Sequence, residues 1–270
     1  MRKVAAFALV SLAIAACTTP PPAPAPDPQR YAAIVAAPDR SAADRTNDER
    51  RHPAQMLAFI GLRPGMVVED LSAARGYTSE LLARSVAPEG KVYAQNPPRP
   101  AASMPARAQP EGGAPAPSAA APAQMPALAE RMRNPALAAV LVPVTRPFED
   151  PIPPEAQGRL DLVTLMFNYH DFGHLGVNRD QVNQAVFRAL KPGGQYIIAD
   201  HSGRTGTGIS ESGTLHRVEE ALVVREVQAA GFRLVGHGDF LRNPADPRDR
   251  NTPEPPMPKD EFVLRFVKPS

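Results

Sequence analysis

The sequence predicts one α/β domain with a doubly wound, mostly parallel seven-stranded sheet and an antiparallel pair at its C-terminal end. Continuous apolar runs, clearest at 66–71 and 159–167, are typical of parallel strands that are buried on both faces. Segments with helical spacing of apolar residues separate the first five runs from one another. The last two runs are joined by the loop 238–260 without a helix, which favours an antiparallel edge pair.

The first half of the domain, which we place from residue 40, alternates helices with strands. In chain order we predict a helix over 48–60 that ends at Gly61, a strand at 66–71, a helix at 77–86, a strand at 90–96, a helical turn at 127–133 and a strand at 139–145. Between the last two of these strands, residues 97–126 contain nine prolines and ten alanines. Such low complexity cannot build a core, so we predict a disordered insertion there.

The second half begins with the clearest strand and ends with the antiparallel pair. In chain order we predict strand 159–167, helix 179–190, a Lys-Pro-Gly-Gly turn into strand 195–200, a long amphipathic helix over 214–230 closed by Gly231, and strands 232–237 and 261–267. Phe262, Leu264 and Phe266 alternate with the intervening side chains, as expected of a strand.

The N-terminus has the pattern of a bacterial secretory signal, with basic residues, then an apolar stretch that ends at residue 16. Ile14-Ala15-Ala16-Cys17 is similar to the lipobox of bacterial lipoproteins, in which the cysteine becomes the lipidated first residue. A plain signal peptide with an unrelated cysteine is the alternative. We predict a signal peptide at 1–16, lipidation at Cys17 and a proline-rich tether over 17–39. The resemblance implies an exported protein anchored to the membrane facing the periplasm, with Thr18 favouring the outer membrane.

Charge and cysteine content exclude several classes of protein. The formal net charge is +2, from 30 basic and 28 acidic residues, and removal of the signal with Arg2 and Lys3 leaves 28 of each. A near-neutral chain without basic patches gives no reason to expect nucleic-acid binding. A single cysteine excludes an internal disulfide framework and a zinc cluster of thiolates.

Five segments within roughly residues 40–268 form a characteristic combination: Val67–Ala83 with Gly76-Tyr77-Thr78, the strand and loop Asp161–Asp171, Ala189-Leu190-Lys191-Pro192-Gly193-Gly194, Thr214–Leu222 and Leu241–Pro247. Together these five segments resemble the class I S-adenosylmethionine-dependent methyltransferases. The last two look like the exported methyltransferases of bacteria. The resemblance implies a Rossmann-like fold with S-adenosylmethionine at the carboxyl ends of the strands.

The cofactor site that the resemblance implies departs from the family at two points. The family's glycine-rich turn after the first strand has three glycines, and this chain has Ser72, Ala74 and Gly76 at those places. Left-handed backbone angles are costly for the first two of these residues. The acid that holds the ribose after the second strand is replaced by Asn96, or by Gln95 in another register. The implied cofactor-binding residues are Asp70, Ser72, Ala74, Gly76, Asn96 and Asn168.

Candidate catalytic residues follow the strands 159–167 and 195–200, at the edge where this fold keeps its acceptor. We predict His170 as general base, with Tyr169 or Asn168 shaping the methyl pocket and His201 on the same rim. Alternatively, His170 and the residue after it only cap the loop and form local hydrogen bonds.

Five side chains of this rim could in principle gather around a metal: His170, His174, Asp200, His201 and His216. We predict no metal, because Gly173 weakens a helical pairing of the first two and such clusters often bond only one another.

These observations favour an exported, lipid-anchored methyltransferase that acts on a small molecule or an envelope component. The alternative is a catalytically inactive lipoprotein of the same fold with a binding or envelope-associated role. In both, the lipid at Cys17 is the only expected contact with a membrane.

Overall fold

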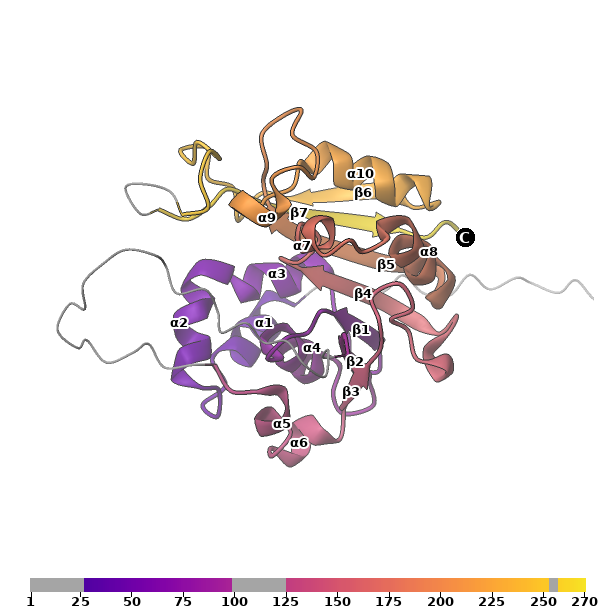
Figure 1. Cartoon of the computed structure of the whole chain (residues 1–270). Helices are drawn as coiled ribbons and strands as arrows, with labels where there is room; N and C mark the ends of the chain where they lie inside the picture. The colour runs from indigo at the N-terminus through magenta and orange to yellow at the C-terminus, as the bar shows by residue number, and fades with distance from the viewer. Residues whose placement is uncertain (1–26, 99–124, 253–256) are drawn as a thin grey trace, which may run out of the picture.

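The computed structural model describes residues 27–98, 125–252 and 257–270 of the chain (Figure 1). Seven strands form one sheet in the order β3-β2-β1-β4-β5-β7-β6. The first five strands pair in parallel, and β7 runs antiparallel to both β5 and β6. The predicted fold class, a Rossmann-like doubly wound sheet with an antiparallel C-terminal pair, is confirmed.

The strands lie close to the predicted apolar runs. They are β1 (Val67–Leu71), β2 (Lys91–Asn96), β3 (Leu141–Thr145), β4 (Leu160–Met166), β5 (Leu190–His201), β6 (Arg233–Gly238) and β7 (Glu261–Val267). Only β5 is much longer than predicted, because the Lys-Pro-Gly-Gly turn pairs with the end of the chain. Gly193 N donates to Lys268 O, and Lys268 N donates to Gly194 O.

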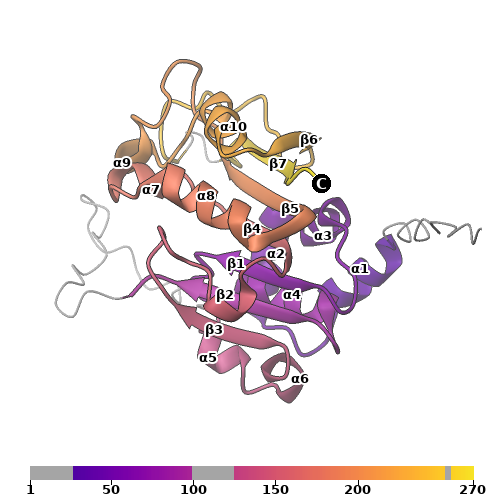
Figure 2. The same cartoon turned by 90° about the vertical axis from the view of Figure 1, so that its right-hand side faces the viewer.

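Helices cover both faces of the sheet. They are α1 (Pro28–Val35), α2 (Ala42–Arg51), α3 (Pro53–Ile60), α4 (Tyr77–Val86), α5 (Leu128–Arg131), α6 (Pro135–Ala138), α7 (Asp171–His174), α8 (Arg179–Ala189), α9 (Ser212–Leu215) and α10 (Glu220–Ala229), with a 3₁₀ turn at Pro154–Ala156. Figure 2 shows α8 and α10 on the opposite side of the sheet from α3 and α4. Buried Leu57 and Leu82 belong to one core, and Val186 and Val227 to the other. Among the described residues, no helix is long and apolar enough to cross a membrane.

Two predicted helices are each divided by a residue in the left-handed conformation. His52 (φ 45°) separates α2 from α3, and His216 (φ 51°) ends α9 before α10 begins. The predicted continuous helix 214–230 is therefore wrong at its start. Arg217 and Val218 leave the helix because both are fully buried, and Val218 bridges to Ser202 at the end of β5.

The folded part begins earlier than predicted, so the tether assigned to 17–39 is too long. Asp27 caps α1, and Tyr31 on this helix is 1% exposed. Its hydroxyl donates to Leu62 O at 2.8 Å, which ties α1 to the loop before β1. The predicted signal peptide, Cys17 and most of the insertion, residues 99–124, lie outside the described residues.

A buried ion-pair network fixes the chain where it returns after the insertion. Arg131 of α5 binds both carboxylate oxygens of Asp44 at 2.8 Å and also contacts Glu80. Its Nε donates to Arg75 O in the loop after β1. Because the guanidinium is buried with two carboxylates, α2, α4 and α5 are locked together around that loop.

Candidate functional site

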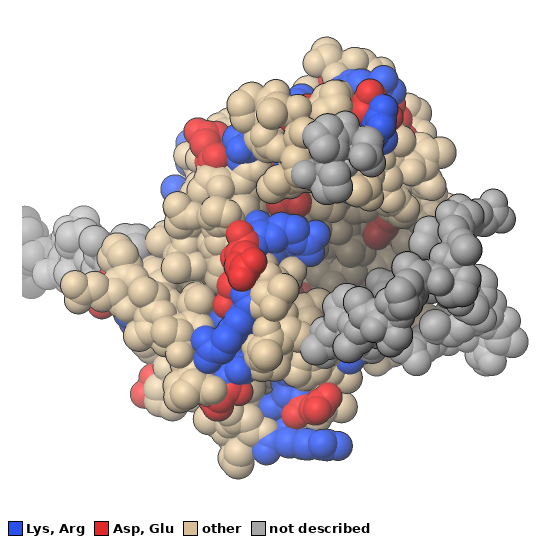
Figure 3. Space-filling view, turned by 90° about the vertical axis from the view of Figure 1, so that its left-hand side faces the viewer, with Lys and Arg blue, Asp and Glu red and all other residues tan. Residues whose placement is uncertain are grey.

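A cavity of about 500 Å³ lies at the carboxyl ends of β1 and β4, under α2 and α3. Figure 3 views the molecule from this edge and shows it hollowed between two halves. Its polar lining includes Asn47, Arg50 and Arg51 of α2, with Ser72 and Asn168 from the loops after the two strands. Leucines and methionines of α3 and α4 make much of the remaining wall. The volume is that of a site for a small molecule or a nucleoside-sized cofactor.

The loop between β1 and α4 keeps the backbone of a glycine turn without two of its glycines. Ser72 has φ 56° and Ala74 has φ 49°, both in the left-handed region, and Gly76 has φ 81°. Each non-glycine residue there costs on the order of 1 kcal/mol. The surrounding structure must therefore hold this loop in place.

Two amide side chains at the end of β2 supply that support. Gln95 Oε1 accepts a hydrogen bond from Ser72 N at 3.0 Å, and Asn96 Oδ1 accepts one from Ala74 N at 2.8 Å. Gln95 N⁠ε2 donates to Arg146 O, so this buried amide is satisfied at both ends. Asn96 does not line the cavity, and the structure gives it the role of a loop brace rather than of a ribose ligand.

Asp70 reaches the cavity wall with both oxygens already bonded. Thr164 Oγ1 donates to Oδ1 at 2.7 Å, and Ser79 Oγ donates to Oδ2 at 2.6 Å. Burial raises the pKa of Asp70 to about 6, against the opposing effect of the two hydroxyls. Asp70 therefore joins β1 to β4 and α4 at the edge of the cavity.

Position 76 must be a glycine because helix α5 packs closely against it. A Cβ there would lie 2.7 Å from Leu128 Cδ1 and 3.3 Å from Arg131 Cδ, both on α5. Gly76 lies between two residues of the cavity wall, Arg75 and Tyr77, and the structure shows its close packing against α5.

Four of the predicted cofactor-binding residues line the cavity: Asp70, Ser72, Ala74 and Asn168. Ser72 Oγ donates to Asn168 Oδ1 at 2.8 Å, which closes the wall between the loops after β1 and β4. The preceding Phe167 also lines the cavity and has φ 60°, so it is a third strained residue beside this space, after Ser72 and Ala74.

Arg51 is a cavity residue that the sequence analysis missed. Its guanidinium carbon lies 3.3 Å from the centroid of the Phe167 ring, and its Nη1 lies 3.0 Å from Glu261 Oε1. Burial lowers the pKa of Arg51 to about 10, although Glu261 opposes the shift. The Arg50-Arg51 pair at the end of a polar helix was the available signal, but its helix could not be placed beside β4 from spacing alone.

The two predicted catalytic histidines stand beside one another behind Phe167 and outside the cavity lining. The ring centroid of His201 is 5.6 Å from that of Phe167 and 5.4 Å from that of His170. Burial holds the pKa of His201 well below its usual range, so this imidazole is neutral. Burial lowers the pKa of His170, but the carboxylates of Asp200 and Asp171 beside the ring outweigh burial and raise the pKa to about 9. With these two carboxylates as its partners, His170 is an imidazolium at neutral pH. In that state His170 has no lone pair with which to accept a proton, whereas the predicted role of general base requires the neutral ring.

Tyr169 points away from the cavity. It is fully buried, its hydroxyl donates to Glu226 Oε2 at 2.7 Å, and Asn183 Nδ2 donates to it at 3.0 Å. The predicted part of Tyr169 in a methyl pocket is replaced by a hydrogen-bonding role between α8 and α10.

No family model matches the chain, and no curated protein matches it. Solved structures do. A SAM-dependent methyltransferase from Aquifex aeolicus is 18% identical, with TM-score 0.54, over 90% of this chain and 98% of that one. An arsenic(III) S-adenosylmethionine methyltransferase from Chlamydomonas reinhardtii is 14% identical, with TM-score 0.51, over 92% and 75%. The cyclase SpnF is 13% identical, with TM-score 0.52, over 81% and 82%. These likenesses show the fold, and a fold supports more than one chemistry.

Proposed function

We propose that the chain is an S-adenosylmethionine-dependent methyltransferase whose cofactor occupies the cavity at the ends of β1 and β4. The observation that carries the proposal is the position of this cavity. It opens beneath a turn of glycine-like backbone, at the point of the sheet where the strand order reverses between β1 and β4. Methyltransferases of known structure share the fold.

The residues of the cavity fit the amino-acid part of such a cofactor. Arg50 and Arg51 are cations that suit a carboxylate, and the small residues Ser72 and Ala74 leave room against the loop. The fit is poorer for a ribose diol, because Asn96 is engaged with Ala74. Ribose recognition would rest on neutral groups of the wall such as Asn47 and Asn168.

S-adenosylmethionine, when bound, supplies an electrophilic methyl group on a sulfonium. The chain's own contribution is positioning and exclusion of water, which dominate such reactions. Arg50 and Arg51 fix the charged end of the ligand, and Met166 and Phe167 give an apolar wall on the side of β4. His170 and His201 stand behind that wall, on the side where an acceptor would approach.

Calorimetry of the purified chain against S-adenosylmethionine and S-adenosylhomocysteine tests the proposal. We expect binding of both, weakened at least tenfold, about 1.4 kcal/mol, by Arg50→Ala. Arg45→Ala, at an exposed position of the same helix and outside the cavity, is the matched control. Absence of binding at millimolar concentration of both ligands contradicts the proposal.

A second candidate is a non-catalytic relative that binds a ligand without transferring a methyl group. The observation in its favour is the loop after β1, whose donors at Ser72 and Ala74 are already bonded to Gln95 and Asn96. Binding of the cofactor without methyl transfer to any extract of small molecules or envelope components would favour this candidate.

We also propose, from the sequence around Cys17, that the protein is exported and lipid-anchored on the periplasmic side, with an envelope component or a small molecule as acceptor. Expression of Cys17→Ser in a Gram-negative host should release the protein from the membrane fraction. Unchanged retention in that fraction contradicts lipidation at Cys17.

A further inference from the structure

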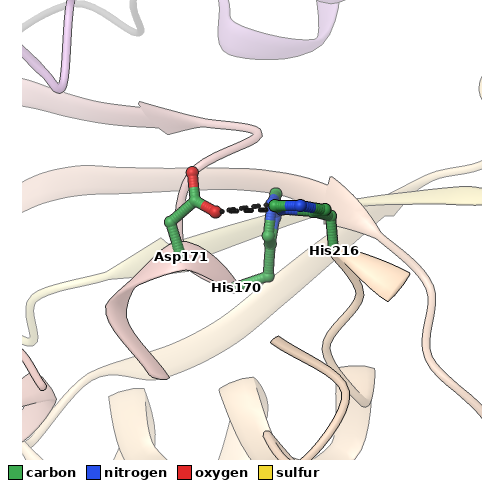
Figure 4. Close-up of side chains that lie close together, drawn as sticks. All are labelled: His170, Asp171 and His216. Carbon is green, nitrogen blue, oxygen red and sulfur yellow. Dashed lines mark hydrogen bonds and ion pairs between the residues drawn. The ribbon is translucent and has the colours of Figure 1, made fainter. Parts of the chain in front are cut away.

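Three side chains outside the cavity converge on one point at the carboxyl edge of the sheet (Figure 4). His170 Nε2 lies 3.1 Å from Asp171 Oδ1, and His216 Nδ1 lies 3.3 Å from the same oxygen. The three ligating atoms all lie within 4.8 Å of one another. In a tetrahedral zinc site with bonds of about 2.0–2.1 Å, neighbouring ligand atoms are separated by about 3.3 Å. The spacing therefore already resembles that of a ligand shell.

His170 is oriented by a buried carboxylate. Its Nδ1 lies 2.6 Å from Asp200 Oδ1, and its backbone N donates to Asp200 Oδ2 at 2.7 Å. Because a carboxylate only accepts, Nδ1 carries a proton. Nε2 faces Asp171, and it becomes a metal ligand when the second proton of the imidazolium is released to solvent on metal binding. A histidine that donates to a carboxylate through one nitrogen and offers the other is the usual arrangement of a metal-binding histidine.

The fold brings the third side chain from a distant part of the sequence. Helices α7 and α9 pack closely because two glycines face the contact. A Cβ at Gly173 would lie 2.7 Å from Ser212 Oγ, and one at Gly213 would lie 3.0 Å from His174 Cβ. Gly173, which we expected to weaken a pairing of histidines, instead allows the approach that brings His216 to Asp171.

His216 is held in place at a cost in backbone strain. It has φ 51°, and the next two residues are fully buried. Arg217 Nη1 lies 2.9 Å from Asp246 Oδ2, and Val218 N donates to His201 O at 3.1 Å. A strained residue directly before two such anchored residues presents its side chain in a fixed position.

The cluster is open to solvent on one side. The side chain of Asp171 is 25% exposed and that of His216 is 40% exposed, whereas that of His170 is 5% exposed. His174 lies beside it, with its ring centroid 5.8 Å from that of His216. Water or another ligand can therefore complete a coordination shell.

We propose that His170, Asp171 and His216 bind a divalent transition-metal ion. Two imidazoles and one carboxylate suit zinc and its neighbours, whereas magnesium and calcium prefer oxygen ligands alone. Three protein ligands with an open position are the pattern of a site that binds or activates a further molecule. The proposal replaces our expectation of no metal and does not depend on methyl transfer.

Zinc titration of the full-length chain tests the site, with Cys17→Ser included so that no thiol competes. We expect one Zn²⁺ per chain by calorimetry and by elemental analysis after gel filtration. His216→Asn should weaken binding at least tenfold, because asparagine tolerates the left-handed backbone but removes the imidazole. The control is His237→Asn. His237 Nδ1 also lies 3.3 Å from a carboxylate oxygen, that of Glu220, outside the cluster.

Thermal unfolding with and without Zn²⁺ separates a lost site from a lost fold, since a ligand of the native state raises the melting temperature. We expect the shift in the parent chain and in His237→Asn, and its loss in His216→Asn and Asp171→Asn. Magnesium at the same concentration should give no shift. Absence of zinc binding by the parent chain, or equal binding by the parent and His216→Asn, overturns the proposal.

Discussion

The loop Ser72–Gly76 and the segment Ser212–Val218, which we call the rim segment, both hold non-glycine residues in the left-handed conformation, with different consequences. In the loop, the strained residues are small and their backbone donors are bonded inside the protein by Gln95 and Asn96. In the rim segment, the strained residue is His216, which presents a ring nitrogen to Asp171. Strain thus preserves the shape of a cavity in one region and positions a polar side chain in the other.

Removal of the anchor of the rim segment should have the largest effect. Arg217 is fully buried and bonds Asp246 and Ser202 O. Arg217→Met leaves the carboxylate of Asp246 without its cation, so we expect a loss of about 3–5 kcal/mol in the free energy of unfolding. Urea denaturation measures this loss. The control is Arg233→Met at an exposed position, which should change the free energy of unfolding by less than about 0.5 kcal/mol. A loss below about 1 kcal/mol for Arg217→Met means that the rim segment is held by other contacts.

The strand that leads into the loop carries a second carboxylate, Glu69, which has no hydrogen-bond partner among the described residues. Burial raises its pKa to about 9. Between the unfolded pKa of about 4.5 and the folded pKa, the native state holds a proton that the unfolded state releases, so stability falls as pH rises. We expect a fall of up to roughly 1.4 kcal/mol per pH unit between pH 6 and 8 from this group.

Glu69→Gln should flatten that dependence and stabilise the protein at pH 8. Urea denaturation of the parent and the variant at pH 6, 7 and 8 measures the difference. If the free energy of unfolding depends on pH in the same way in the parent and in Glu69→Gln, then Glu69 ionises in the native state as readily as in the unfolded one.

A smaller effect is expected from the amide that braces the loop. Gln95→Leu leaves Ser72 N and Arg146 O without their partners, at a cost of about 2 kcal/mol. If the loop shapes the cofactor cavity, binding of S-adenosylhomocysteine should weaken together with stability. Gln184→Leu, which removes an exposed amide of α8, is the control and should change neither quantity. Unchanged ligand binding in Gln95→Leu would separate the loop from the cavity's function.

Relief of strain should give the smallest effect. Ala74→Gly is expected to stabilise the protein by about 0.5–1 kcal/mol, because the gain at φ 49° exceeds the entropy that glycine loses on folding. Ala83→Gly, in the middle of α4, should destabilise by a similar amount. A loss of stability in Ala74→Gly contradicts the interpretation of the loop as strained.

His216→Gly in the rim segment should also relieve strain, but it should abolish the zinc-dependent rise in melting temperature.

Local sequence patterns located the elements well, because a strand buried on both faces is a continuous apolar run and glycine or proline marks its ends. The runs at β1 and β4 and the helix Tyr77–Val86 required nothing more. The helix predicted over 214–230 failed because periodicity cannot show that Arg217 pairs with Asp246 and leaves the helix. Tyr31 was assigned to a tether because it is buried by packing against α3 and bonds Leu62 O, and no local pattern of residues shows such contacts.

The sequence by itself determined the fold class, the edge of the sheet where polar residues gather, and the places where the glycine turn departs from its family. Each of these depends on residue type and local spacing. Only the tertiary structure decided what those residues touch. It turned Asn96 into a brace and Tyr169 into a core residue, and it joined His216 to Asp171 across 45 positions of sequence. Such pairings follow from how strands order and helices pack, which no short stretch of sequence encodes.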